Sequence, residues 1–310
     1  MSEAPVGLSV LDGLDIGIGT WAWGDRLVWG YGQGYAAEDV RQVFDASVDA
    51  GIRLFDTAEV YGQGRSEQFL GEFLKTTDQR IIVATKFMPY PWRLSKRSLL
   101  KALHASLKRL GLPQVDLYQM HTPMPPMNVE TWMDAMIEAV QAGLTREVGV
   151  SNYDRSWTQR AYDALAREGI HLASNQVEYS LIDRRIEKNG LLKHCQDLGV
   201  KVMAYSPLGM GLLTGKYTVD HPMRGFRASA KGRLQSKVEP LLKLMKHIGS
   251  DHAGKTPAQV AINWTICKGT LPIPGAKTLT QAEQNAGAVG WRLADDEVAA
   301  LDEASDRVLA

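Results

Sequence analysis

The sequence predicts an α/β fold, a closed (β/α)8 barrel of the TIM type, and three observations point to it. Short apolar or β-branched segments recur along most of the 310 residues. Helical patterns separate these segments, and continuous apolar strands that alternate with helices indicate a parallel sheet covered by helices. No linker, low-complexity tract or internal repeat divides the chain, so residues 1–310 are expected to form one barrel domain.

The strand and helix signals alternate in order along the chain. The predicted strands are 15–20, 52–57, 81–86, 115–121, 146–152, 172–179, 200–207 and 271–277. The segment 38–51 has one apolar helical face and ends at Gly51, and the segment 97–111 likewise ends at a glycine. A third helix, 256–269, opens with Thr256 as an expected N-cap and Pro257 at its first position.

Two segments add to the plain barrel pattern. The segment 8–15 predicts a β-hairpin that turns at Asp12 and Gly13 and closes the bottom of the barrel. The interval 208–256 follows the seventh strand and is longer than one helix needs, with a helix expected to resume near Leu234. Because barrel active sites lie in the loops at the carboxyl ends of the strands, we expect this long loop to have a function at the active site.

Composition excludes several classes of partner. Thirty-five basic side chains balance thirty-five acidic ones, so no net field favours nucleic acid or a membrane surface. The sequence has no apolar run near the ~20 residues of a membrane span, and its first residues do not resemble a signal peptide. Cys195 and Cys267 fit buried thiols in a reducing compartment, and no metal-ligand spacing occurs. A cytoplasmic protein is expected.

Four chemically distinct side chains stand where predicted strands run into loops: Asp56, Tyr61, Lys86 and His121. Each has an ordinary structural explanation: a turn cap, a surface aromatic, a lysine reaching from a strand end, and a histidine bonded to a loop carbonyl. All four, however, fall at the same end of one predicted barrel. An acid, a phenol, an amine and an imidazole together suit the transfer of a proton to a carbonyl oxygen.

Each of these side chains has a plausible role in reducing a carbonyl group. Tyr61 is the natural proton donor, although a phenol has an ordinary pKa of about 10. A nearby Lys86 ammonium is expected to lower that pKa, and Asp56 is expected to hold Lys86 in place. His121 is expected to hydrogen-bond the substrate oxygen and to fix its orientation.

The order and spacing of these residues resemble those of the aldo-keto reductases. The resemblance runs from Ile16 to Trp291 and includes FDTAEVYGQGRSEQFLG (55–71), VGVSNY (148–153), AYSPLGMGLLTGKY (204–217) and PIPGAKTLTQAEQNAGA (272–288). The segments IDRRIEKNGLL and GAK-x3-QA are most similar to the reductases of cyanobacteria and plastids. Met120 precedes His121 where the family has leucine. The resemblance implies an NADPH-dependent reduction of an aldehyde or ketone.

The resemblance also implies where NADPH would lie. The residues implied at the nicotinamide end are Thr20, Trp21, Asp56, Ser151, Asn152, Gln176 and Tyr205. Those implied along the phosphates are Ser206, Pro207, Leu208, Gly209, Lys216, Arg224 and Arg227. Those implied around the adenosine are Gly275, Lys277, Gln281, Gln284 and Asn285, with Lys277 on the 2′-phosphate.

The substrate is expected to be a small carbonyl compound held between aromatic and apolar walls. The residues expected to form these walls are Trp21, Trp23, Trp29, Met88 and Trp92. The same side chains could instead pack the rim of the barrel, and the sequence does not decide between the two.

Two other functions fit parts of the sequence. Lys86 could form a Schiff base in a lyase, although the nucleotide-binding look of 272–288 disfavours this. The chain could also be a non-catalytic redox sensor that binds NADP(H), as potassium-channel β-subunits of the family do. Those subunits carry another residue at the position of His121, so this histidine favours an enzyme.

The pattern Gly17-x-Gly19-x-x-Ala22 lacks the helix that a dinucleotide fingerprint needs.

Overall fold

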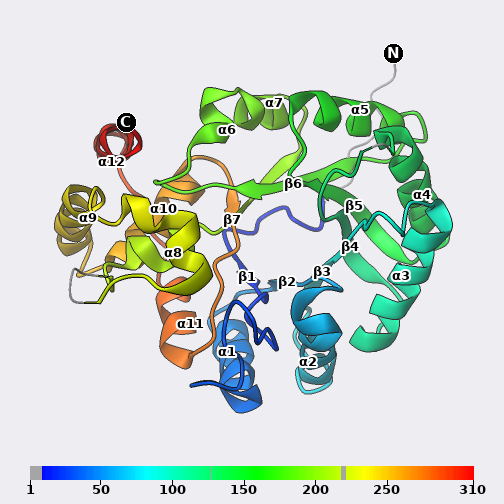
Figure 1. The fold of residues 1–310 in the computed structure, drawn as a ribbon, viewed down its shortest axis with the longest axis horizontal. Coiled ribbons are helices and arrows are strands. Elements are labelled where there is room, and N and C mark those ends of the chain that lie inside the picture. The colour runs from blue at the N-terminus through cyan, green and yellow to red at the C-terminus, as the bar shows by residue number, and fades with distance from the viewer. Residues whose placement is uncertain (1–8, 126, 218–220) are drawn as a thin grey trace.

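The computed structural model describes residues 9–125, 127–217 and 221–310. Its core is an eight-stranded sheet in which each strand pairs in parallel with the next, in the order β1 to β8. Figure 1 labels β1 to β7 in the middle of the molecule. The strands are β1 (Gly17–Gly19), β2 (Leu54–Asp56), β3 (Ile82–Phe87), β4 (Val115–Met120), β5 (Thr145–Ser151), β6 (Leu172–Glu178), β7 (Lys201–Tyr205) and β8 (Leu271–Pro272). A parallel bridge between Gly19 and Gly275 joins the two edges and closes the barrel.

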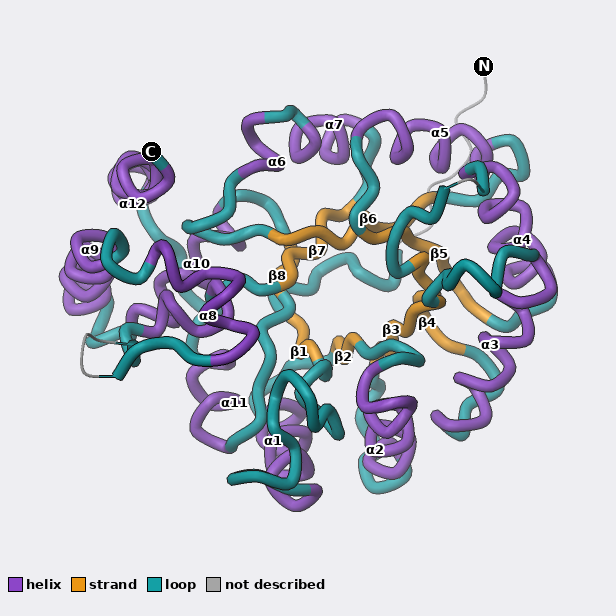
Figure 2. Tube along the Cα trace, viewed as in Figure 1, coloured by secondary structure: helices purple, strands orange, loops and turns teal. Residues whose placement is uncertain are grey.

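Helices form a ring outside the strands (Figure 2). The α-helices of the first half are α1 (Ala37–Asp49), α2 (Arg65–Leu74), α3 (Lys96–Leu110), α4 (Val129–Gln141) and α5 (Arg155–Ala166). Those of the second half are α6 (Arg185–Lys188), α7 (Leu191–Asp197), α8 (Gly225–Lys231), α9 (Glu239–Asp251), α10 (Pro257–Cys267), α11 (Leu279–Ala286) and α12 (Asp295–Leu309). Short 3-10 turns are η1 (Tyr61–Gly64), η2 (Gly209–Thr214) and η3 (Gly232–Leu234).

The helix signals in the sequence are confirmed at their ends. Gly111 follows α3 in the left-handed conformation, with φ at 67°, which glycine adopts without steric cost. The Thr256 side chain accepts a hydrogen bond from Gln259 N at the start of α10, and Pro257 occupies the first helical position. Among the described residues, no helix is both long and apolar enough to cross a membrane.

The inside of the barrel has an apolar layer near its amino-terminal end. The side chains in this layer are Leu54, Ala84, Leu117, Ala173, Met203, Leu271 and Ile273, with Leu11 packed among them. Leu11 is fully buried and precedes β1, so the chain before the first strand closes this end of the barrel. A larger apolar cluster fills the space between the strands and the helices.

The structure differs from the sequence prediction at two places in the barrel. The described residues from Ser9 onward form a turn, in which Asp12 N donates to Ser9 O at 3.0 Å, instead of the predicted hairpin. Gly13 adopts φ of 75° as the turn requires, but the residues before β1 pair with no second strand in the described chain. β8 is shorter than predicted because Pro272 and Pro274 have no N–H to donate to a ladder.

Candidate functional site

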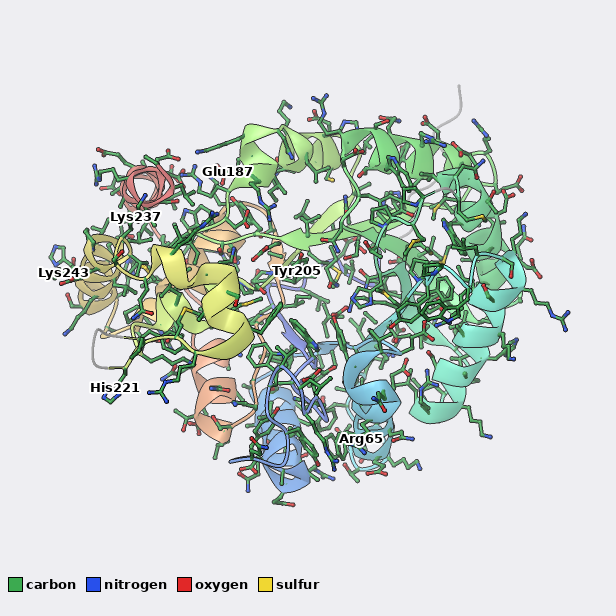
Figure 3. The ribbon with its side chains drawn as sticks, viewed as in Figure 1. Arg65, Glu187, Tyr205, His221, Lys237 and Lys243 are labelled. Atoms are coloured by element: carbon green, nitrogen blue, oxygen red, sulfur yellow. The ribbon has the colours of Figure 1, made fainter. Side chains whose placement is uncertain are left out.

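A cavity of about 490 Å³ opens at the carboxyl ends of the strands. Figure 3 shows Tyr205, one of its lining residues, over the middle of the barrel. Of the residues predicted to bind nucleotide, those that line it are Trp21, Asp56, Ser151, Asn152, Gln176, Tyr205, Ser206, Pro207, Leu208, Lys216, Gly275, Lys277, Gln281, Gln284 and Asn285. Tyr61 and His121 also line it. One cavity therefore brings together segments that lie far apart in the sequence.

Lys86 lies under this cavity and is fully buried. Its ammonium contacts Asp56 Oδ2 at 2.5 Å and donates to Thr57 O at 2.8 Å. Burial lowers the pKa of Lys86, and the carboxylate of Asp56 opposes that effect. The charge on this lysine therefore depends on the carboxylate beside it.

Tyr61 comes from the turn η1 after β2, and its ring contacts the side chains of Lys86 and His121. The Lys86 ammonium lies 5.0 Å from the ring centroid, and the His121 ring meets it edge-on at 5.7 Å. Burial, with a smaller contribution from Asp56, raises the pKa of Tyr61 well above its ordinary value. This direction is opposite to the prediction, because the loss of water around the phenol and the negative charge of Asp56 both disfavour the phenolate. The phenol therefore keeps its proton at neutral pH.

His121 follows β4 and is uncharged at neutral pH. Burial lowers its pKa to about 3, and the Lys86 ammonium contributes in the same direction. Its Nδ1 atom is buried and has no hydrogen-bond partner among the described residues. A neutral imidazole has one N–H to donate, which suits contact with a carbonyl oxygen.

Gln119 of β4 belongs to this site but was missed in the sequence. Its Nε2 donates to Asp56 Oδ1 at 3.1 Å, and Gln176 Nε2 donates to the same oxygen at 2.9 Å. In the strand register Gln119 faces Lys86, two residues beyond Leu117 of the apolar layer. The period of two along a strand was the signal that could have placed Gln119 inside the barrel.

The amide of Gln176 has a fixed orientation as a result. Its nitrogen donates a hydrogen bond to Asp56, so its oxygen is the atom that can accept a hydrogen bond from a ligand in the cavity. Asn152 Nδ2 donates to His121 O at 3.2 Å and to Ser151 Oγ at 3.1 Å. Tyr205 in turn donates its hydroxyl to Asn152 Oδ1 at 3.0 Å. These bonds hold the side chains predicted at the nicotinamide end in one connected set.

The segment after β8 forms the other end of the cavity. Thr278 caps α11 by accepting from Gln281 N, and Gln281 Oε1 accepts from Lys277 N at 2.9 Å. The Lys277 ammonium lies 4.5 Å from the ring centroid of Tyr35 and donates to Trp29 O at 3.5 Å. The cation predicted for a 2′-phosphate therefore lies at the cavity and also contacts the loop after β1.

The long loop after β7 contributes α8, which reaches the cavity through Phe226. Lys231 at the end of this helix is buried, with 8% of its surface exposed. Its side chain contacts two carboxylates. Its ammonium lies 2.9 Å from Glu178 and 3.2 Å from Asp183. This largely buried ion pair connects α8 to the end of β6.

The aromatic wall predicted for a substrate is present only in part. Trp21 stacks on Tyr61 with ring centroids 6.1 Å apart, and Trp29 meets Trp21 edge-on at 5.6 Å. Both line the cavity beside Val60.

The other three residues predicted for this wall lie elsewhere. Trp23 is fully buried and donates to Ala276 O at 3.0 Å, so it is a core residue. Trp92 is 77% exposed and stacks on Tyr90, while Met88 also lies outside the lining. The sequence places these aromatic residues in loops but does not say which way a loop side chain points.

Some predicted nucleotide contacts also need correction. Thr20 is fully buried and donates to Asp56 O at 3.0 Å, so its side chain supports the site from behind. Gly209 is buried against Ile182 and is absent from the lining, where Gly211 is found. Arg224 does not line the cavity, and the side chain of Arg227 lies outside what the structure describes.

The chain is similar to known proteins over most of its length. The model of the Aldo/keto reductase family matches residues 15–306. The chain is 40% identical over 303 residues to pyridoxal reductase, chloroplastic, of Arabidopsis thaliana, which covers 94% of this chain and 82% of that protein. It is 30% identical to an aldo/keto reductase of Klebsiella pneumoniae solved in complex with NADP and acetate, with a TM-score of 0.72 and coverage of 93% and 90%. A glycerol dehydrogenase structure from Gluconobacter oxydans gives 26% identity, a TM-score of 0.82 and coverage of 96% and 93%.

Proposed function

Because the chain belongs to the Aldo/keto reductase family, as the match over residues 15–306 shows, we propose that it reduces an aldehyde or ketone to the alcohol with NADPH. The observation that carries this proposal is the floor of the cavity. There a protonated phenol, Tyr61, lies edge-on to a neutral imidazole, His121, with ring centroids 5.7 Å apart. A proton donor and a second hydrogen-bond donor are what a carbonyl oxygen requires as negative charge develops on it.

The residues present fit a nicotinamide nucleotide. The fixed amide of Gln176 leaves an acceptor for the carboxamide, and the Tyr205 ring offers a flat surface beside it. Gly211 adopts φ of 93° in the lining, where a backbone without Cβ allows a phosphate to approach closely. Lys216 and Lys277 bring positive charge to the phosphate end. The Klebsiella pneumoniae relative was solved with NADP, which supports the same choice here.

The side chains then divide the chemistry between them. When bound, the nucleotide supplies a hydride to the carbonyl carbon. Tyr61 gives its proton to the carbonyl oxygen and becomes a phenolate. Lys86 stabilises that phenolate from 5.0 Å, measured from its ammonium to the ring centroid. His121 donates a hydrogen bond that orients the oxygen.

We propose an aromatic aldehyde as the class of substrate. Trp21 and Trp29 form two nearly perpendicular walls, with an interplanar angle of 82°. Trp21 also stacks on Tyr61. Flat rings bind well against such surfaces. The relative named as a pyridoxal reductase is 40% identical to this chain, which makes pyridoxal the first aldehyde to test.

The test is the absorbance of NADPH followed with a panel of aldehydes that includes pyridoxal and nitrobenzaldehyde. Wild type should oxidise NADPH, while Tyr61→Phe should lose at least about 100-fold in kcat because the proton donor is gone. Nucleotide binding, read from the fluorescence of bound NADPH, should stay within about twofold, because the phenol makes no contact that a nucleotide needs. Loss of binding with unchanged turnover would contradict the assignment of Tyr61.

The other functions considered make different predictions in the same experiment. A redox sensor would bind NADPH but would not oxidise it with any aldehyde of the panel. In a Schiff-base lyase, borohydride would trap the carbonyl substrate on Lys86, and no nucleotide would be needed. The full burial of Lys86 and its pairing with Asp56 disfavour this second function, because a Schiff base needs an accessible, uncharged amine.

A further inference from the structure

Beneath the cavity floor lies an amide side chain that is not among the predicted site residues. Gln119 is fully buried, and its nitrogen faces the Asp56 carboxylate at 3.1 Å. Its oxygen faces two donors, Ser174 Oγ and Gln176 Nε2, each at 3.4 Å. Because donors lie at one end of the amide and an acceptor at the other, only one orientation of Gln119 satisfies them all.

The neighbouring strand leaves space for this amide. In the register of β5 and β6, Gly149 faces Ser174. A Cβ atom on Gly149 would collide with Ser174 Oγ and would lie 3.1 Å from Gln119 Cγ, closer than side chains normally pack. The absence of a side chain at Gly149 therefore makes room for Gln119 under Asp56.

The contacts of Gln119 act on the charged pair at the site. The Asp56 carboxylate uses Oδ2 for Lys86 at 2.5 Å and Oδ1 for the amides of Gln119 and Gln176. Burial disfavours a charge on Lys86, and Asp56 is the main group that opposes this. The charge on Lys86 therefore depends on Asp56 being ionised and correctly turned.

Three other titratable groups face this pair. Glu67 of α2 also favours the charged form of Lys86, while Tyr61 and His121 lie above it. None of the three is among the hydrogen-bond partners of the Asp56 carboxylate, so they do not replace the contact from Gln119.

We propose that Gln119 is a positioning residue whose amide holds the Asp56 carboxylate against Lys86 and so keeps an ammonium beside Tyr61 during proton transfer. This inference rests on the proposed function and adds a residue to it. Gln119 acts through Asp56 and touches neither the carbonyl group nor the nucleotide.

Two nearly isosteric substitutions should differ in their effect on the pH profile. Gln119→Met removes the donor, so Asp56 stabilises the ammonium less well and the pKa of Lys86 falls. The alkaline limb of kcat should then shift down by about one pH unit. Gln119→Glu adds a carboxyl group near Lys86. When this group is protonated it still donates to Asp56, and when ionised it favours the ammonium, so the limb should stay or move up.

The experiment measures kcat for pyridoxal reduction from pH 6 to 10 in wild type and in both variants. Gln119→Met should lower kcat about tenfold, the effect of losing one hydrogen bond to a charged group. The Kd of NADPH should stay within about twofold, because Gln119 is absent from the cavity lining. Asn175→Leu is the matched control: this amide is fully buried in β6 but bonds Tyr153 O and Thr158 Oγ1, away from Asp56. It should lower stability and leave the pH profile unchanged.

Several results would overturn the inference. The two Gln119 variants could shift the limb in the same direction, or neither could shift it, or Asn175→Leu could shift it as much as Gln119→Met. If Gln119→Met does not fold, a limb in Gln119→Glu that moves to lower pH also overturns it.

A crystal structure of Gln119→Met tests the positioning without any turnover. The Asp56 carboxylate should rotate and lengthen its contact with Lys86, and an unchanged carboxylate overturns the inference. If none of the aldehydes allows the wild type to oxidise NADPH, the proposed function fails on that result alone. The crystal structure still decides the role of Gln119.

Discussion

His121 is held uncharged by its surroundings, and this has a consequence for the pH dependence of the reaction. Its pKa is lowered to about 3 by burial and by Lys86, so the imidazole gains no proton until the solution is far more acidic than the ordinary pKa of about 6.5 would require. Between pH 8 and 5.5 we therefore expect kcat to change by less than about twofold through this residue.

A titration of kcat near pH 6.5 would contradict the neutral His121, provided that it disappears in the His121→Asn variant. The asparagine keeps an N–H donor but cannot titrate, so it is the matched control. A titration that persists in His121→Asn belongs to another group.

Lys277 provides a second prediction at the scale of one residue. We expect Lys277→Ala to weaken NADPH about tenfold or more and NADH hardly at all, because only NADPH carries a 2′-phosphate for the ammonium to meet. Fluorescence titration with both nucleotides measures this. Lys216→Ala is the control, since Lys216 also lines the cavity but is assigned to the phosphates that both nucleotides share. Equal losses in Lys277→Ala would remove the 2′-phosphate role.

The sequence was informative about residues at strand ends and less so about residues in loops. Asp56 and His121 could be placed because Asp56 ends the apolar strand β2 and His121 directly follows β4. Gln119 looked like an ordinary strand residue, since its role depends on which neighbours the barrel brings to it. Trp23 and Trp92 could not be separated from Trp21, because a sequence does not give the direction of a loop side chain.

At the scale of the elements, the buried cation of Lys231 joins α8 to the barrel. Lys231→Met should leave Glu178 and Asp183 without this partner and release α8 from the end of β6. The protein should still fold, because Asp183 also pairs with Arg185 at 2.8 Å. The Kd of NADPH should rise about tenfold while kcat at saturation stays within about twofold, as for a segment that covers a ligand without joining the chemistry.

Fluorescence titration and saturation kinetics measure this prediction. Lys243→Met is the matched control, because Lys243 on α9 pairs with Glu239 on an exposed surface. An unchanged Kd in Lys231→Met would show that α8 does not depend on the buried cation.

Helices were predictable in the sequence where a capping residue marks their ends, as Thr256 and Gly111 do. The order of the strands could be predicted as well, because each one alternates with a helix. The end of the last strand could not, since Pro272 and Pro274 suit an extended chain but have no N–H to donate to a neighbouring strand. The Asp12-Gly13 pair predicts a hairpin before β1, but such a pair suits several kinds of turn, and the structure has a turn without a second strand there.

At the scale of the whole molecule, the barrel interior has an apolar layer below and a polar layer above. Leu54, Ala84 and Leu117 lie in the apolar layer, and the residues two positions further along the same strands are Asp56, Lys86 and Gln119. The period of two along a strand thus places the residues proposed for chemistry two positions beyond residues of the apolar layer.

This separation predicts that the lower layer can be weakened without harm to the reaction. Leu11→Ala should lower the free energy of unfolding by about 2–4 kcal/mol, since it leaves a cavity among fully buried side chains. The kcat should remain within about twofold of wild type. Denaturant unfolding measures the first quantity, and Leu27→Ala, at a position that is 94% exposed, is the control that should change neither. A large fall in kcat for Leu11→Ala would mean that the two layers are not independent.

The barrel closes at an edge that has fewer backbone contacts than its other edges. Gly19 meets Gly275 through a single bridge, supported by a bond from Gly19 N to Pro274 O at 3.1 Å, while every other neighbouring pair is a strand ladder. Gly19, Pro274 and Gly275 all line the cavity, so the proposed nucleotide would lie across this edge. A bound nucleotide would then act as a clasp: the free barrel would open first at this edge, and the loaded barrel would be held shut by its own coenzyme.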